Sequence, residues 1–152
     1  MRNSRPGSWM PRGKRVAEVI FLGVVGAVLV AIAVCDARWQ VVPAVLIWPA
    51  LLGSLAFRVV RGEWWHLVAA AVVGGLMAIP TAIWGEERAG LGDAQVYGLV
   101  GLALGGAAVY VVALASLTAG LYGKVRRRQA VPVAPFIAGA TLVVWSVGLV
   151  QR

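Results

Sequence analysis

Long apolar runs separated by short polar stretches set the pattern of this chain. The runs at 16–35, 43–60, 64–84 and 132–150 each carry few charged residues. Each is close to the roughly 20 residues that an α-helix needs to cross a bilayer. A segment in lipid must satisfy its backbone polar groups internally, so each run predicts a transmembrane helix.

A further run over 94–122 contains no charged residue. It is too long for one typical span of about 20 residues and short for two. A break at Gly105 and Gly106 would divide it into spans at 94–104 and 107–122, whereas a continuous helix would make one span. The fold class is therefore all-α: a polytopic helical membrane protein with six transmembrane helices, or five if 94–122 is unbroken. The G-x-x-x-G step at Gly101 and Gly105 predicts a close helix contact.

Composition supports a chain embedded in the membrane. Of its 152 residues, 61% are hydrophobic and only 13% are charged, whereas a soluble domain would carry about 25% charged residues. The longest polar stretch is the N-terminal tail, so a separate soluble domain is not expected. We divide the chain into a basic tail at 1–15 and a transmembrane domain at 16–152.

The net charge of +8 does not indicate nucleic-acid binding. The basic residues cluster in the tail and at 124–128, where they flank apolar spans. In these places they contact lipid headgroups and set the topology, so the expected partner is the lipid bilayer. One cysteine, Cys35, and one histidine, His66, rule out an internal disulfide and a cysteine- or histidine-rich zinc site. We expect no metal and no cofactor, and the sequence indicates no particular oligomeric state.

The chain has only two aspartates, and both lie at predicted span ends. Asp36 ends the first apolar span, and Asp93 closes the motif GLGD just before another span. Two spans separate them, so both should lie at the same face of the membrane. An aspartyl protease needs at least two carboxyl groups. The ionised carboxylate activates water, and the protonated carboxyl group polarises the scissile carbonyl.

Each aspartate also has a structural interpretation. Asp93 could be a helix N-cap, although a cap alone does not require Gly90 and Gly92, which permit close backbone approaches. Asp36 at a helix C-terminus would oppose the macrodipole, so a structural role for it is less natural. A helix N-terminus should favour a charged Asp93, and a helix C-terminus should resist a charged Asp36. We therefore expect Asp36 to carry the shared proton at rest, although the titration of a coupled pair belongs to both members.

The other polar residues have simple interpretations. We expect Glu18 to be a solvated charge at a helix start, and Glu63 to form an interfacial pair with Arg61. Glu86 and Glu87 should face water in a loop. His66 begins a span, where it should face headgroups.

Three motifs follow one another along the chain. The first is an aspartate that ends a predicted span, followed by a basic residue and a proline. The second is G-x-G-D before a span, and the third is a pair of prolines near the start of the last span. The residues are Asp36, Arg38 and Pro43; Gly90, Gly92 and Asp93; and Pro132 and Pro135. In this order the motifs resemble those of the type IV prepilin peptidases, aspartyl proteases of the bacterial inner membrane.

The resemblance implies a multi-pass protein of the bacterial inner membrane that cleaves prepilin-like leader peptides at the cytoplasmic face. Asp36 and Asp93 would be catalytic, and the other six motif residues would shape the substrate site. It also implies an N-terminus outside the cytoplasm, whereas the five basic residues of the tail favour an N-terminus inside. The chain resembles the short, peptidase-only members, so methyltransferase activity is not expected.

Two departures from the family pattern leave alternatives open. Gln95 stands where many members have a lysine, and Ala44 stands where an asparagine often follows the proline. A catalytically inactive relative with a structural or assembly role is therefore the second hypothesis. An unrelated small transport protein is the third, although transporters commonly place charged groups within spans rather than at span ends.

Overall fold

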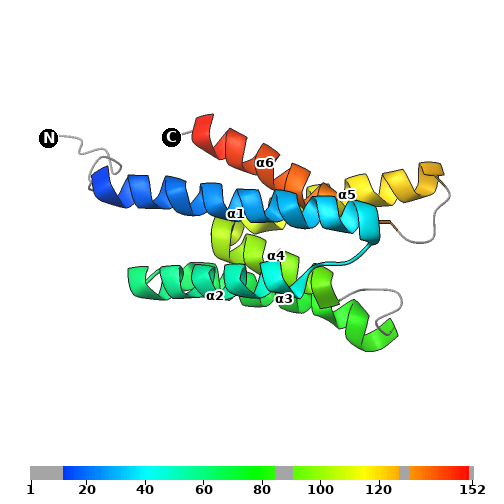
Figure 1. Ribbon diagram of the computed structural model, residues 1–152, viewed down its shortest axis with the longest axis horizontal. Helices are drawn as coiled ribbons and strands as arrows, with labels where there is room; N and C mark the ends of the chain where they lie inside the picture. Colours follow the sequence, from blue (N-terminus) through cyan, green and yellow to red (C-terminus); the bar gives the residue numbers. More distant parts are fainter. Residues whose placement is uncertain (1–11, 85–90, 127–130, 151–152) are drawn as a thin grey trace, which may run out of the picture.

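The computed structural model describes residues 12–84, 91–126 and 131–150, and all regular secondary structure in this part of the chain is helical (Figure 1). Successive helices run in opposite directions along the long axis of the molecule. The all-α prediction is confirmed. The elements are α1 (Arg12–Trp39), α2 (Ala44–Arg61), α3 (Trp64–Trp84), α4 (Leu91–Leu104), the 3-10 turn η1 (Gly105–Ala107), α5 (Ala108–Arg126) and α6 (Ala134–Val150).

The described helices are apolar enough to form a multi-pass membrane protein. Three stretches are long and apolar enough to span a bilayer: Arg15–Trp39, Ala44–Arg61 and Gly92–Arg126. Trp64–Ile79 and Ala134–Gly148 are shorter apolar helices. The stretch Gly92–Arg126 passes through the η1 turn, where the chain reverses direction between α4 and α5 (Figure 1).

The reversal depends on Gly105. Its φ of +58° lies in the left-handed region, which residues with a Cβ rarely adopt. The His66 ring also lies 3.1 Å from the place where a Cβ on Gly105 would be. The break predicted at Gly105 and Gly106 is therefore confirmed, and the described chain has six helices rather than five.

Two helix ends differ from the sequence prediction. The first helix continues past Asp36 to Trp39, and Gln40, with a φ of 52°, ends it by donating its N–H to the Asp36 carbonyl at 2.9 Å. Asp93 is not an N-cap, because α4 already begins at Leu91 and places Asp93 in its first turn. Hydropathy changes mark where a span becomes polar, but backbone hydrogen bonds decide where a helix ends.

The fourth helix is the centre of the bundle. Val96, Leu99 and Val100 in α4 are completely buried. Its closest neighbour is α3, and glycines make this approach possible. A Cβ on Gly101 would lie 2.5 Å from the Ala70 Cα, so the two backbones are in direct contact there. The close helix contact predicted from the G-x-x-x-G step is confirmed at Gly101.

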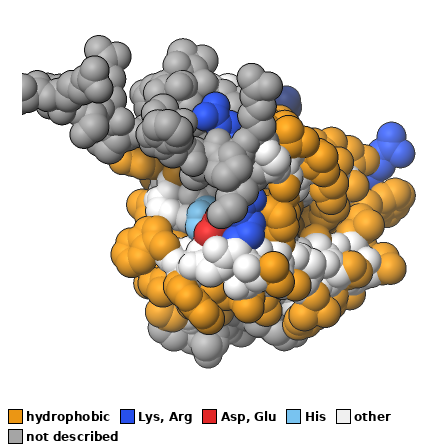
Figure 2. Space-filling view, turned by 90° about the vertical axis from the view of Figure 1, so that its left-hand side faces the viewer, with side chains coloured by type: hydrophobic (Ala, Val, Ile, Leu, Met, Phe, Trp, Pro, Cys, Tyr) orange, Lys and Arg blue, Asp and Glu red, His pale blue; other side chains and the backbone are white. Residues whose placement is uncertain are grey.

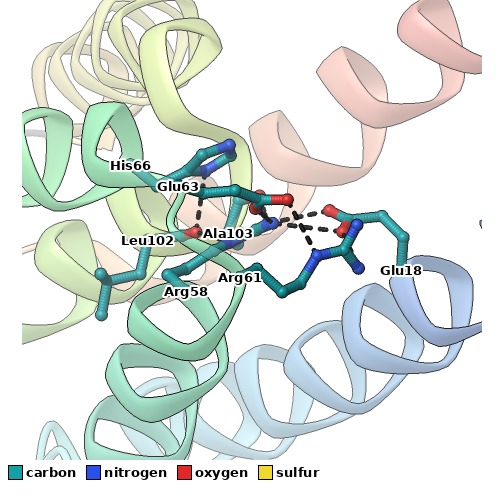
Figure 3. A network of polar contacts seen from close by, with 7 residues as sticks. All are labelled: Glu18, Arg58, Arg61, Glu63, His66, Leu102 and Ala103. Carbon is teal, nitrogen blue, oxygen red and sulfur yellow. Dashed lines mark hydrogen bonds and ion pairs between the residues drawn. The ribbon is translucent and has the colours of Figure 1, made fainter. Parts of the chain in front are cut away.

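An ionic network joins α1, α2 and the link between α2 and α3 at one end of the bundle (Figure 3). Arg58 is 1% exposed and pairs with Glu18 at 2.9 Å and with Glu63. Arg61 pairs with the same two carboxylates, at 3.1 Å and 2.9 Å. Seen from outside, this end shows acidic, basic and histidine side chains side by side within a largely hydrophobic surface (Figure 2).

The network corrects two interpretations of the sequence. Glu18 is not a solvated charge, because the fold brings two arginines of α2 onto its carboxylate. His66 is half-buried, and its Nδ1 lies 3.0 Å from the Leu102 carbonyl oxygen, so the prediction that it faces headgroups is wrong. The expected pair of Arg61 and Glu63 is confirmed.

Substitution of Gly101 tests the contact between α3 and α4. Gly101→Ala should lower the free energy of unfolding by about 1–3 kcal/mol, because the new methyl group would push the two backbones apart. Gly75→Ala in α3 is the matched control, since a Cβ there meets nothing within 4 Å. Thermal unfolding in detergent should therefore separate the two variants, and equal midpoints would contradict the close contact.

The pH dependence of stability tests the ionic network. Burial alone would raise the pKa of Glu63, but its hydrogen bond to Arg58 and the charges of Arg58 and Arg61 lower that pKa below 4.5. The resulting stabilisation is present above pH 4.5 and is lost as the pH falls through the lower pKa of the folded state. The stability of the parent should therefore fall more steeply in acid than that of Glu63→Gln. Parallel stability curves in detergent would count against this linkage.

Candidate functional site

The two aspartates come together at the end of the bundle opposite the ionic network. Asp36 lies in the last turn of α1, and Asp93 lies in the first turn of α4. These helix ends are on the same side of the molecule (Figure 1). Asp36 is only 6% exposed, Asp93 is half-buried, and the two carboxyl groups are close enough to interact electrostatically.

The start of α6 binds the Asp36 carboxyl group directly. The Ala134 N–H donates a buried hydrogen bond of 3.0 Å to Asp36 Oδ2. Ala134 is the first residue of α6, and the first N–H groups of a helix have no partner within it. Asp36 therefore satisfies one of these donors, and the positive end of the α6 dipole favours its ionised form.

The prolines of the first and third motifs lie at or just before the starts of α2 and α6. Pro43 precedes α2, and its carbonyl accepts hydrogen bonds from Leu46 N at 3.0 Å and Ile47 N at 3.1 Å. Pro135 is the second residue of α6, where its missing N–H removes no helix hydrogen bond. Pro132 lies two residues before α6. These prolines restrict how the chain enters α2 and α6, and the start of α6 contacts Asp36.

Gly92 brings the start of α4 against the link between α1 and α2. A Cβ on Gly92 would lie 2.9 Å from the Cβ of Val42, the residue before Pro43. A Val42 Cβ moves only with its backbone, so any side chain at position 92 would displace the link. Gly92 therefore allows the first and second motifs to pack together. Gly90 lies outside the described residues, and Arg38 is exposed in the last turn of α1.

Tyr97 is a site residue that the sequence analysis missed. It is 3% exposed, lies one helical turn after Asp93, and interacts with it electrostatically. Its hydroxyl lies against Ser116 of α5. The spacing of four residues places Asp93 and Tyr97 on the same face of a helix, which is the signal that could have identified it.

The arrangement offers two interacting carboxyl groups, a helix N-terminus and a buried phenol. Such a set can take a proton from water, return it, and stabilise a developing negative charge. Within the part of the chain that the structure describes, no three metal-binding side chains of His, Cys, Asp or Glu lie together.

The sequence profile of the type IV leader peptidase family matches residues 23–124. The chain belongs to this family. The matched region contains both Asp36 and Asp93 and ends before Pro132 and Pro135. No curated protein and no solved structure matches the chain. Membership of a leader peptidase family excludes the hypothesis of an unrelated transport protein.

Two substitutions of Asp36 in this leader peptidase family member test the bond to α6. Asp36→Ala leaves the buried Ala134 N–H without an acceptor, which should cost about 1–3 kcal/mol of stability. Asp36→Asn keeps a carbonyl oxygen at the same place and should therefore lose less stability than Asp36→Ala. Both variants remove the interaction with Asp93, so their difference reports the hydrogen bond. Equal midpoints in thermal unfolding would show that the bond contributes nothing.

Proposed function

We propose that this protein is a membrane aspartyl endopeptidase that removes leader peptides from prepilin-like proteins. The proposal places it in the bacterial inner membrane, with cleavage at the cytoplasmic face. One observation supports it above the others. In a chain of the type IV leader peptidase family, the only two aspartates come from different helices and meet at one end of the bundle.

The proposed mechanism uses the two carboxyl groups in different protonation states, because two close carboxyl groups share one proton. Asp36 is ionised and takes a proton from water, whose oxygen attacks the scissile carbonyl carbon. Asp93 is protonated and gives its proton to the carbonyl oxygen. When the tetrahedral intermediate collapses, the C–N bond breaks, the leaving nitrogen receives the proton held by Asp36, and Asp93 recovers its own from the hydroxyl group.

This assignment reverses the expectation from the sequence, which placed the resting proton on Asp36. The sequence argument compared the C-terminus of the helix that carries Asp36 with the N-terminus of the helix that carries Asp93, and it counted the membrane boundary against a charged Asp36. The bond from Ala134 N–H adds a donor and a second helix terminus of opposite polarity, and both favour a charged Asp36. The proposal therefore makes Asp36 the base and Asp93 the acid.

The orientation of the protein in the membrane depends on the number of helices. With six helices in the described chain, α1 begins and α6 ends on one side, and the end of α1 and the start of α4, which carry the aspartates, lie on the other (Figure 1). The basic residues Lys124 and Arg126 end α5 on the side of the aspartates. A cytoplasmic position for this side agrees with the preference of basic loops for the inside. It also places the N-terminus outside, against the preference of the five basic residues in the tail at 1–15.

A catalytically inactive relative is the second candidate. Gln95 is half-buried in α4, and Ala44 is the exposed first residue of α2. Both differ from the family pattern close to the aspartates. A cleavage assay separates this candidate from the main proposal.

The assay is co-expression with a prepilin from the same genome, scored for removal of the leader. The parent should process the substrate, and Asp36→Asn and Asp93→Asn should each lose at least about 10²-fold in rate, because each removes one proton-transfer group. Ser146→Ala, at an exposed position on α6, should process normally.

Processing that survives either aspartate substitution would exclude the dyad mechanism. No processing by the parent, with the protein present in the membrane, would favour the inactive relative.

A further inference from the structure

The ionic network is built around one arginine whose bonds do not all go to acids (Figure 3). Arg58 Nε donates to the Leu102 carbonyl oxygen at 2.8 Å, and Nη2 donates to the Ala103 carbonyl oxygen at 2.7 Å. Both hydrogen bonds are buried and cross from α2 to the end of α4. The proposed reaction uses none of these groups, because they lie at the other end of the bundle.

The two carbonyl groups belong to the last turn of α4, which ends at Leu104. The last four carbonyls of a helix have no partner within it. Leu102 and Ala103 are each only 4% exposed, so their carbonyl groups must be satisfied by protein rather than by water. Arg58 supplies two donors and a positive charge at the negative end of the α4 dipole, and His66 lies 3.0 Å from the same Leu102 oxygen.

The side chain must be an arginine for this geometry. The guanidinium group is a planar fork with donors on several edges, so it can bond two carbonyls and two carboxylates together. Glu18 and Glu63 compensate the charge that burial would otherwise make costly. A lysine at position 58 would keep the charge but not the fork.

The helix that Arg58 binds, α4, carries Asp93 at its other end. With 14 residues, α4 is a rod of about 21 Å. Its middle is packed tightly, because Val96, Leu99 and Val100 are completely buried. An axial shift at Leu102 and Ala103 would therefore be transmitted to the first turn, where Asp93 faces Asp36.

We propose that Arg58 is a positioning residue for Asp93: by holding the C-terminal carbonyls of α4, it sets the depth of Asp93 in the membrane from the opposite end of the helix. The consequence for turnover rests on the proposed function, whereas the consequence for helix depth does not. The competing explanation is that packing against α3 alone fixes α4, in which case Arg58 contributes only stability.

The depth of α4 can be measured without a substrate. A nitroxide is attached to Gln95→Cys in a Cys35→Ala background of the full chain, since Cys35 is the only native cysteine. Its depth in lipid vesicles is read from collisions with oxygen and with a water-soluble nickel reagent. Arg58→Lys should shift the label by at least about the 1.5 Å rise of one residue. Arg61→Lys is the matched control and should leave it in place.

Turnover is measured on the unlabelled proteins. Arg58→Lys should lower kcat by about 10- to 100-fold with KM changed less than about twofold, because a displaced catalytic group lowers the rate of the chemical step. Val111→Ala, a core substitution in α5, controls for a general loss of stability. It should lower the midpoint of unfolding without moving the label.

A second variant covers the case in which Arg58→Lys does not fold. His66→Ala removes a neighbour of the same Leu102 oxygen and leaves the pairs of Arg58 in place, so it should shift the label in the same direction by less. An unchanged label depth in the folded variants overturns the proposal, as does a shifted label with unchanged kcat. If the parent does not cleave, the proposed function fails, and the depth measurement alone decides the role of Arg58.

Discussion

The reversal of the chain after Leu104 is the constraint on which the rest of the structure depends. It divides the longest apolar run into α4 and α5, and thereby gives the bundle an even number of helices. Because α4 and α5 are separate helices, α6 begins at the end of the bundle where α1 finishes. The hydrogen bond from Ala134 N–H to Asp36 requires that placement, as does the arrival of the third motif beside the first two.

The same reversal creates an electrostatic problem that the fold solves with Arg58. A helix ending inside a membrane protein exposes carbonyl oxygens in a region of low dielectric constant, where an unsatisfied group costs several kcal/mol. Arg58 binds two of these oxygens, and two glutamates balance its charge. Arg58 thus places a cation at the last turn of α4, where it complements the negative end of the α4 dipole.

Glycines let the backbones come close enough for these contacts. Gly101 brings α4 against α3, Gly92 brings its first turn against Val42, and Gly105 permits the left-handed turn after it. Lipid provides no hydrophobic force between helices, so close packing of this kind is a main source of attraction. One helix therefore depends on three glycines for its position, and that helix carries one of the two aspartates.

The sequence by itself determined the apolar spans, the break at Gly105 and Gly106, and the placement of each aspartate at a span end. These features are local, because hydropathy and glycine conformation depend on neighbours in the chain. Only the tertiary structure decided what each charge meets. Arg58 and Glu18 are 40 residues apart, and Asp36 and Ala134 are 98 apart. No periodicity links such positions, so the pairing of Glu18 and the donor on Asp36 emerge only once six helices pack together.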